Sequence, residues 1–473
     1  MLHTVLAALP LLIAAGAMLA RWPAPRAAAV SLAAAILIAV TVFRVPAAQW
    51  GAMVLDLAPT LLEVMLILLG GVTLSRLMNA SGDTQQVASW VERACQGQPQ
   101  RAVALMVLGV TPFAESFTGF GLGLVIAIPL LRHLGFNRSK ALALGLLGLF
   151  LTTWGGLSPG SIIAAHLTGL DLVTVGTATA WFAPPVSLAA AIFAFWVGTG
   201  RVRPSALGRT VLVLIPHSVV LIATNTFLGP ALGGVLASVT AIVAILLLFR
   251  IQYGPIPALD RATLVSLQPY AVLAGGLLVV TAISVVIDLG GVAVLTSGAL
   301  WLAIASGVAG LRLHRSRPGE LTRELRASVR TWFPVGLATG GFLIVGTVLT
   351  TSGMTATLGA ALASSVLLHA LLAPLLGALS GMVTGSNSGA NAMLVATQLD
   401  AAQTLGAHAT SAVAMQHLGS SVGTLLAPSR LALGRAVVGA DATDHVPVGH
   451  DLPKVAGFVA VSVLWLGIAM QLF

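Results

Sequence analysis

The sequence predicts an all-α, polytopic membrane protein with about 12 transmembrane helices, and three observations support this fold class. Hydrophobic residues make up 57% of the 473 residues and charged residues only 8%, whereas a soluble domain carries about 25% charged residues. Apolar stretches of roughly 20 residues, enough to cross a bilayer, recur along the chain. Lys and Arg cluster in the short segments between them, as in cytoplasmic loops.

The apolar stretches define the expected helices in chain order. They are residues 2–20, 27–43, 53–76, 140–165, 172–199, 209–228, 231–249, 269–287, 291–311, 331–351 and 455–473. The first has the composition of a signal peptide, but no Lys or Arg precedes it and Arg21 follows it. A cleaved signal has the opposite order, so we expect residues 2–20 to remain as the first helix.

The distribution of charge predicts the topology. Basic residues outnumber acidic ones by 23 to 14, and this excess lies between apolar stretches, which argues against a nucleic-acid partner. Basic clusters place four loops in the cytoplasm, and residues 77–100 read as a cytoplasmic amphipathic segment. The same counting puts both chain ends outside. A single cysteine, Cys95, excludes a disulfide framework and a cysteine-based metal site.

The chain divides into two halves that carry polar interruptions in corresponding positions. Residues 1–249 and 269–473 form the halves, and 250–268 form a cytoplasmic linker that contains Pro255 and Pro257. Each half has a polar, Gly-rich interruption flanked by half-length apolar runs, within a predicted re-entrant hairpin. The hairpins are expected near residues 101–132 and 366–398, and a second interruption ending at a proline follows each of them, at 152–161 and 420–428.

Paired interruptions of this kind predict an inverted-repeat transporter. Backbone that is not helical at membrane depth must be buried in protein or line a wet cavity. Interrupted segments in corresponding positions of two halves are the best sequence indication of a transporter's binding site. The helix N-termini created there favour a carboxylate. The alternative is that the Gly and Ser residues only allow helices to pack closely.

Glu115 is the principal candidate for proton coupling. It lies inside the first interruption with apolar runs on both sides, and an ionisable residue within a membrane is by default a hypothesis about function. The alternative is a structural acceptor for the N–H groups of the loop. Glu63 is a second, weaker candidate for proton coupling, seven residues after Asp56 on one helical face.

The polar residues at the interruptions are the candidates for substrate binding. They are Ser116, Thr118, Gly119, Gly121, Thr384, Gly385, Ser386, Asn387, Asn391, Gln398, His417, Ser420, Ser421 and Arg430. Arg430 has two interpretations of equal weight: an anchor at the cytoplasmic end of a helix, or a cation that faces a substrate carboxylate. No metal cluster, nucleophile triad or phosphate loop is present in the sequence, so the predictions contain no cofactor, no metal and no catalytic residue.

At these interruptions the sequence resembles the lactate permease family of bacterial transporters. Residues 115–121 resemble the family's Glu-Gly-x-x-Gly-Phe-Gly, and Thr384-Gly-Ser386 with Asn391 and Gln398 resembles its Thr-Gly-Ser, Asn and Gln pattern. Its late glycine and proline correspond to Gly423 and Pro428. Residues 168–171 and 225–230 also resemble intervening stretches of the family.

The resemblance implies two re-entrant hairpins that frame the substrate, with Glu115, Thr118, Gly119 and Gly121 in one hairpin. Thr384, Ser386, Asn391 and Gln398 would come from the other. The chain departs from the family at Thr424, where a lysine is expected. Arg430, six residues later, would point to a different face of a continuous helix.

The expected function is proton-coupled symport of a small monocarboxylate such as L-lactate or glycolate, across a bacterial cytoplasmic membrane. Its partners would be the organic anion, protons and the lipid bilayer. A sodium-coupled organic-anion carrier, with its ion near Asn387 or Asn391, and an exporter remain alternatives. An intramembrane enzyme is a remote alternative, because only Glu115 with a distant His could supply a catalytic pair. The oligomeric state stays open, a homo-oligomer included.

Overall fold

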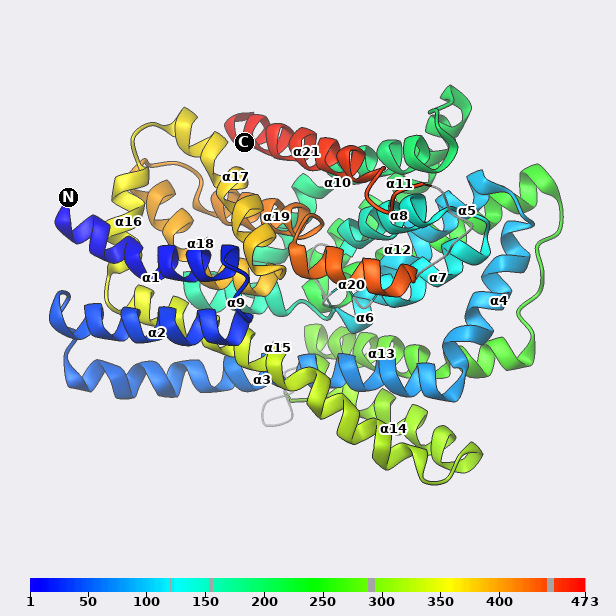
Figure 1. The fold of residues 1–473 in the computed structure, drawn as a ribbon, viewed down its shortest axis with the longest axis horizontal. Coiled ribbons are helices and arrows are strands. Elements are labelled where there is room, and N and C mark those ends of the chain that lie inside the picture. Colours follow the sequence, from blue (N-terminus) through cyan, green and yellow to red (C-terminus); the bar gives the residue numbers. More distant parts are fainter. Residues whose placement is uncertain (120, 122, 153–155, 288–293, 440–445, 473) are drawn as a thin grey trace.

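In the computed structural model, the regular structure of the described residues is entirely helical, so the predicted all-α fold class is confirmed. The described residues are 1–119, 121, 123–152, 156–287, 294–439 and 446–472. The long helices run roughly along the horizontal direction of Figure 1, and the short helices α6, α9 and α20 lie near the centre.

Helices α1 to α12 cover the first half, together with a π-helical turn (η1) and a 3-10 turn (η2). Their bounds are α1 Leu2–Leu19, α2 Ala24–Thr41, α3 Ala47–Ser81, α4 Asp83–Cys95, α5 Pro99–Leu105, η1 Met106–Val110, α6 Thr111–Thr118, α7 Gly123–His133, α8 Arg138–Leu149, η2 Phe150–Thr152, α9 Pro159–Thr168, α10 Leu172–Thr199, α11 Pro204–Phe227 and α12 Pro230–Tyr253.

Helices α13 to α21 cover the second half. Their bounds are α13 Arg261–Val286, α14 Gly298–Ser316, α15 Glu320–Thr351, α16 Met354–Leu362, α17 Val366–Thr384, α18 Asn387–Thr404, α19 Ala409–Thr424, α20 Pro428–Val438 and α21 Leu452–Leu472. The irregular part of the linker is shorter than predicted, because α12 and α13 extend into it and leave only residues 254–260 between them.

Among the described residues, ten helices are long and apolar enough to cross a membrane. They are α1, α2, α3, α10, α11, α12, α13, α15, α17 and α21. The apolar stretch 140–165 is divided between α8 and α9 at the predicted interruption 152–161, because η2 ends at Thr152 and α9 begins only at Pro159. Proline has no N–H to donate and clashes with the preceding turn, so a helix restarts there. The first residues of the predicted stretch 291–311 lie outside the described residues.

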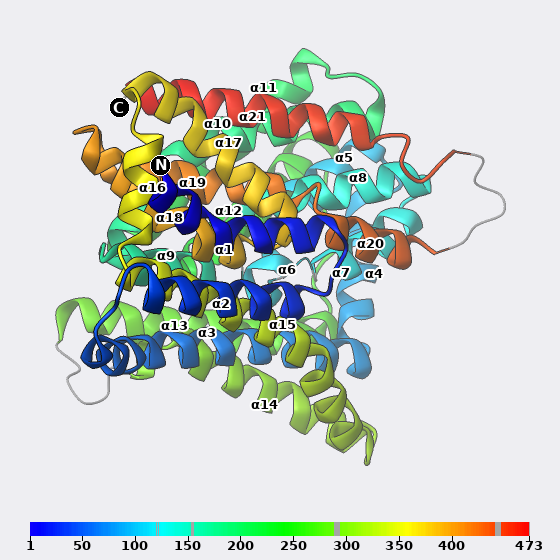
Figure 2. The same cartoon turned by 60° about the vertical axis from the view of Figure 1, so that its left-hand side comes forward.

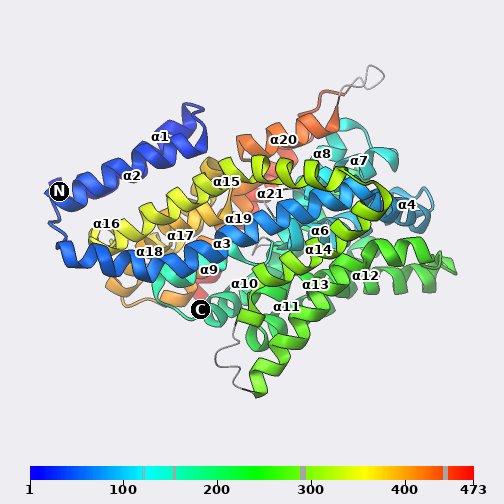
Figure 3. The same cartoon turned by 90° about the horizontal axis from the view of Figure 1, so that it is seen from below.

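The molecule has two distinct ends along the direction of the long helices. The amphipathic helix α4 runs across one end, and both chain termini lie toward the other (Figures 1 and 2). α1 and α2 pack side by side at one edge, with α15 next to α2. α3 lies between α14 and α15 in the view of Figure 3, and it packs against both. The segment with Arg201 and Arg203 that precedes α11 lies at the same end as α4 (Figure 1), and so does the connection between α12 and α13, which is flanked by Arg250 and Arg261.

The two halves contain the same succession of interrupted helices. In the first half, residues 119–122 separate α6 from α7 and residues 153–158 separate η2 from α9. In the second half, residues 385–386 separate α17 from α18 and residues 425–427 separate α19 from α20. Chain order makes α7 the counterpart of α18, and α9 the counterpart of α20. α7 packs against α20 and α9 packs against α18, so the same two positions are joined twice between the halves.

Candidate transport site

The interruptions of each half touch one another near the centre of the molecule. A β-carbon added at Gly119 would lie 3.1 Å from the amide nitrogen of Gly156, so two glycine backbones meet there without side chains between them. In the second half, a β-carbon at Gly385 would lie 3.5 Å from the β-carbon of Ala427. The close approach explains why glycine occupies these positions.

Contacts between the halves join the two pairs of interruptions. The Asn391 side-chain amide donates to the carbonyl oxygen of Gly160 at 3.1 Å, and a β-carbon at Gly160 would collide with the side-chain oxygen of Asn387. On the other side, the Arg430 side chain packs 3.7 Å from the position of a β-carbon at Gly121. Its Nε donates to the carbonyl oxygen of Gly385 at 3.4 Å. All four interruptions, at 119–122, 153–158, 385–386 and 425–427, therefore meet in one region, which we call the convergence.

The segment before α9 has a strained backbone. Leu157 and Ser158 are consecutive residues with positive φ, at 53° and 67°. Each non-glycine residue in this conformation costs of order 1–3 kcal/mol and persists only where its surroundings fix it. The amide of Leu157 donates to the carbonyl of Ser116 at 3.0 Å, and the Ser158 hydroxyl donates to the carbonyl of Pro230 at 2.7 Å. These bonds hold the start of α9 against α6 and α12.

Glu115 connects the two helices of the first interruption. Its carboxylate, on α6, is 2% exposed. One oxygen accepts from the amide of Gly121 at 2.7 Å and the other from the amide of Gly123 at 2.9 Å. The carboxylate thus caps the N-terminus of α7, where it also interacts favourably with the helix dipole. The structural role that the sequence left as the alternative is present, and the charge of Arg430 acts on the same carboxylate.

The hydroxyl groups of the predicted site are used locally. Ser116 and Thr118 donate to backbone carbonyls four residues earlier in the chain. Thr384 donates to the carbonyls of Ser380 and Ser386, and the Ser386 hydroxyl caps α18 by accepting from the amide of Gly389 at 3.4 Å. These residues shape the helix ends, and the hydroxyl protons of Ser116, Thr118 and Thr384 are already engaged in hydrogen bonds.

A buried cluster of amide, imidazole and hydroxyl groups links α18 to α19. The Asn387 amide donates to the carbonyl of His417 and to the hydroxyls of Ser420 and Ser421, at 2.9, 2.9 and 3.2 Å. The Asn391 amide nitrogen lies 2.9 Å from Nδ1 of His417 and 3.0 Å from the side-chain oxygen of Asn387. The structure thus brings five predicted residues together on one side of the convergence.

Among the described residues, three side chains of α18, those of Asn391, Thr397 and Gln398, have buried polar atoms without a hydrogen-bond partner. The side-chain oxygen of Asn391 and both polar atoms of Gln398 are buried without a hydrogen-bond partner, and both residues are fully buried. Seven residues separate them, so they share one helical face. A buried polar atom without a partner costs about 1–3 kcal/mol. This face of α18 is therefore ready to bind a polar ligand or water.

Four helix N-termini point into the region of convergence. α7, α9, α18 and α20 all begin at the interruptions. The first turn of each helix has N–H groups without a partner inside the helix and carries about half a positive charge. Arg430 adds a full positive charge, and no acidic group in the described part of the chain forms a salt bridge with it. The Glu115 carboxylate is the one anion that this positive region already contains among the described residues.

Arg430 reaches the site although its spacing from Thr424 predicted that it would point to a different helical face. That prediction assumed a continuous helix from Thr424 to Arg430. The structure ends α19 at Thr424 and starts α20 at Pro428, so the two residues belong to different helices and the angular argument does not apply. Of the two interpretations of Arg430, a cation at the convergence agrees with the observed contacts.

Glu63 lies away from the convergence. Its carboxylate on α3 accepts from the hydroxyl of Ser297, the residue that caps α14, at 2.9 Å to each oxygen. Gly71, farther along α3, is the position that approaches the carbonyl of Thr118. Glu63 is eight residues from it, about 12 Å along the helix axis. The structure does not bring the second predicted proton site to the first.

Three glycines that make contacts here were not among the predicted site residues. The amide of Gly123 binds Glu115, Gly156 touches Gly119, and the carbonyl of Gly160 binds Asn391. The Pro159-Gly160 pair was the available signal, since proline starts a helix and the glycine after it leaves room for close approach. In the described residues, no group of three His, Cys, Asp or Glu side chains could hold a metal ion.

Comparison with known proteins decides the family. The sequence model of the family described as L-lactate permease matches residues 3–268 and 279–445, and all four interruptions lie within these ranges. The chain belongs to the L-lactate permease family. This permease is a multi-pass membrane transporter and not an enzyme, and its family implies a lactate-like anion as the class of substrate.

Two solved structures are similar to the permease at low sequence identity. The YdaH transporter of Alcanivorax borkumensis is 15% identical, with a TM-score of 0.48 over 90% of this chain and 87% of that one. MtrF of Neisseria gonorrhoeae, which belongs to a class of antimetabolite efflux pumps, is 15% identical, with a TM-score of 0.35 over 82% of this chain and 83% of that one. No curated protein sequence matches the chain.

Proposed function

We propose that this permease carries a small monocarboxylate, such as L-lactate or glycolate, together with a proton across a bacterial cytoplasmic membrane. One observation carries the proposal: the Glu115 carboxylate caps α7 beside Arg430, where helix N-termini from both halves converge. The region is positive apart from one carboxylate of the protein. A second carboxylate, that of the substrate, is the ligand with the matching charge.

The substrate carboxylate binds to Arg430 and to the N–H groups at the start of α18 and α20. A guanidinium binds a carboxylate through two parallel hydrogen bonds. The substrate hydroxyl lies toward the amide cluster, where the side-chain oxygen of Asn391 accepts its proton in a hydrogen bond. Asn391 is well suited to this role because its oxygen has no partner in the protein.

Proton coupling follows from the balance of charge at Glu115. When ionised, Glu115 offers an acceptor to both Gly121 and Gly123 and balances the charge of Arg430. A proton on Glu115 removes that negative charge, and the substrate anion then replaces it. The site has the same net charge when empty and when it holds both a proton and an anion. Binding either one alone leaves an unbalanced charge at membrane depth, which is costly.

In this proposal, the interrupted helices are the part of the permease that moves during transport. The first interruption of each half forms the tip of a re-entrant hairpin, at 101–132 and 366–398, and the two halves are related by an inverted repeat. Alternating access is then a displacement of one pair against the rest of the molecule. The close glycine contacts support this assignment, because smooth backbone surfaces allow neighbouring helices to slide.

Sodium coupling is the second candidate, favoured by one observation. The unpartnered oxygen of Asn391 lies in the cluster that also contains the oxygen of Asn387 and the carbonyl of Gly160. Oxygen atoms of amides and carbonyls are the ligands of a hard cation. The two couplings differ in the gradient that drives accumulation.

Uptake by purified permease in proteoliposomes tests the proposal. Labelled lactate, glycolate and pyruvate are offered with an inward proton gradient, an inward sodium gradient or neither. We expect accumulation of one or more of these acids with the proton gradient only. Accumulation driven by the sodium gradient alone would mean that the coupling ion is sodium, bound at the Asn391 cluster. If none of these monocarboxylates were taken up, the proposed substrate class would be refuted.

A further inference from the structure

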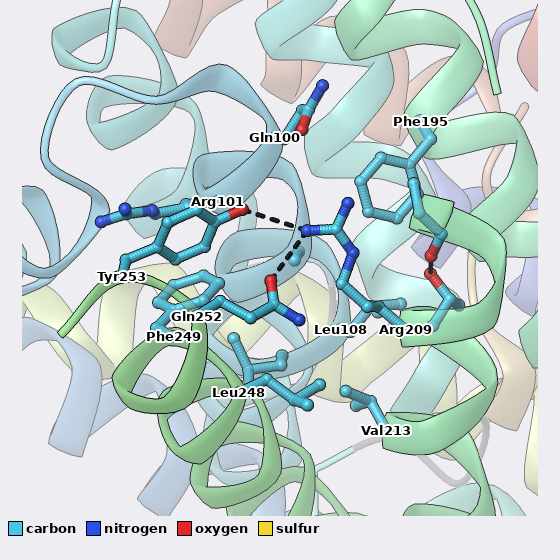
Figure 4. A pocket seen from close by; sticks show the side chains of 14 residues that line it. Gln100, Arg101, Leu108, Phe195, Arg209, Val213, Leu248, Phe249, Gln252 and Tyr253 are labelled. Carbon is cyan, nitrogen blue, oxygen red and sulfur yellow. Dashed lines mark hydrogen bonds between the residues drawn. The ribbon is translucent and has the colours of Figure 1, made fainter. Parts of the chain in front are cut away.

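A second polar pocket lies between the ends of α5, α11 and α12, away from the convergence. Its polar lining consists of Gln100, Arg101, Arg209, Thr210, Gln252 and Tyr253 (Figure 4). The polar lining residues of α5 and α12 lie in the terminal turns of these helices and those of α11 lie in its second turn, at the end of the molecule where α4 runs. The pocket encloses about 50 Å³, room for a few water-sized groups.

Two guanidinium groups define this pocket. Arg101 is 7% exposed, its guanidinium stacks 3.7 Å from the ring centre of Tyr253, and its Nε has no hydrogen-bond partner. Its Nη1 donates to the side-chain oxygen of Gln96 at 2.6 Å. Nη1 of Arg209 donates to the side-chain oxygen of Gln252 at 2.9 Å and to the hydroxyl of Tyr253 at 3.0 Å (Figure 4).

The positive charges of this pocket have no counterion in the described part of the chain. None of its lining residues is acidic, and neither arginine takes part in a salt bridge among the described residues. The hydrogen bonds of both guanidinium groups go to neutral oxygen atoms, including the carbonyl and hydroxyl of Ser205 for Arg209. Arg101 is buried and Arg209 is half-buried. A buried charge is costly unless it is paired, so an anion bound beside these two residues would balance the charge of Arg101.

The deeper wall of the pocket is apolar. Leu108, Val213, Ile245 and Leu248 line it one to two turns farther into the molecule than the arginines. The outer faces of α11 and α12 continue this apolar surface with exposed leucines and valines, as expected for helices in contact with lipid. The pocket thus has a cationic head and an apolar tail region along one axis.

We propose that this pocket binds an anionic phospholipid of the cytoplasmic leaflet, with its phosphate beside Arg209 and Arg101 at the pocket and an acyl chain along the exposed apolar faces of α11 and α12. Basic pockets between transmembrane helices on the cytoplasmic side bind such head groups. The surrounding loops carry further arginines, at 201, 203 and 250, which identify this end as cytoplasmic. The apolar wall favours a lipid over a free phosphate ion, which would use the head region alone.

The test uses purified permease in detergent with phosphatidylglycerol, phosphatidylcholine or inorganic phosphate. Native mass spectrometry measures retained lipid, and a thermal melt measures stabilisation. Phosphatidylglycerol should be retained and should raise the melting temperature, whereas the other two should have little effect. Arg209→Gln should weaken this retention about fivefold, the scale for one basic residue at an anionic surface, and Arg101→Gln should do the same.

Arg250→Gln is the matched control, because it removes the same charge from the same end of α12 without lining the pocket. It should retain phosphatidylglycerol as the wild type does. Equal retention in wild type and in Arg209→Gln would overturn the proposal even if Arg101→Gln failed to fold. Equal stabilisation by phosphatidylcholine would mean that the negative charge of the lipid is not recognised. Equal stabilisation by inorganic phosphate would mean that the pocket binds a free anion instead of a lipid.

Discussion

At the scale of single residues, the Glu115 carboxylate combines an observed structural role with the proposed role in proton coupling. It satisfies two amides that the interruption leaves without helical partners, and it is the negative group nearest to Arg430 at the convergence. A residue that only capped α7 would need no charge, since a neutral acceptor could serve one of the two amides. The two roles can therefore be separated by a substitution that keeps the shape and removes the proton exchange.

Glu115→Gln should abolish accumulation driven by a proton gradient while leaving exchange of labelled for unlabelled substrate. The reason is that glutamine keeps one acceptor oxygen for α7 but carries no exchangeable charge. Uphill uptake and counterflow in proteoliposomes measure the two activities separately. A variant that still concentrates substrate when acid is outside would exclude Glu115 as the proton site.

Arg430→Gln should weaken substrate binding about 10–100-fold, because a hydrogen bond to a charged group contributes about 1.5–3 kcal/mol. Arg430→Lys should recover part of the affinity through its charge. Arg435→Gln, exposed on the same helix α20, is the control and should bind as the wild type does. Binding is measured by scintillation proximity or calorimetry with the purified permease, and equal affinity in Arg430→Gln would move the anion site elsewhere.

At the scale of helices, the site depends on backbones that approach without side chains between them. α9 meets α18 at Gly160, and α17 meets α19 through Gly377, Gly381, Gly419 and Gly423. In lipid, where apolar surface gives no preference for protein over tails, such close packing is the main attraction between helices. The glycines therefore define the distances between the N-termini that form the anion site.

Gly160→Ala should reduce both thermal stability and transport. An added methyl collides with the Asn387 amide, and overpacking of this kind costs typically 1–3 kcal/mol. Gly208→Ala is the control, because its added methyl meets nothing within 4 Å. The melting temperature and the initial rate of uptake are the measurements. Wild-type values of both in Gly160→Ala would mean that α9 and α18 do not pack as described.

At the scale of the whole molecule, the convergence joins residues more than 200 positions apart. Asn391 and Gly160 form a hydrogen bond across a separation of 231 residues. If the interruptions were independent packing motifs, these segments would not be expected to lie close together. Cross-linking between the halves therefore tests the architecture independently of transport.

Cysteines at positions 160 and 387, in a background with Cys95 replaced, should form a disulfide under mild oxidation and stop transport until reduced. Their side chains would point at one another, since a β-carbon at 160 meets the Asn387 side chain. Cysteines at 160 and 404 are the control, because the far end of α18 is about 25 Å away along its axis. Mobility on a non-reducing gel reports the link, and the absence of a link in the first pair would contradict the shared site.

The native cysteine should contribute little background in such experiments. Cys95 is buried at the end of α4, and burial raises the pKa of its thiol to about 12. The thiolate is the reactive form, so at neutral pH this residue stays protonated. Labelling of the folded wild type with a maleimide at pH 7 should be negligible, and it should appear only after denaturation.

The sequence by itself determined the membrane fold and the positions of the interruptions. Apolar stretches such as 172–199, observed as α10 over the same residues, need no tertiary information, because a span must satisfy its backbone within one helix. The family could also be predicted from local motifs, since Glu115 to Gly121 and Thr384 to Ser386 are contiguous in the chain.

Only the tertiary structure decided which residues meet. Arg430 and Glu63 illustrate what sequence spacing leaves open. Arg430 belongs to a new helix that starts at Pro428, so the period of α19 does not determine its direction. Glu63 lies about 12 Å along α3 from the contact with α6. The physical reason is that distances within one helix follow from its period, whereas distances between the halves depend on the glycines at which their backbones meet.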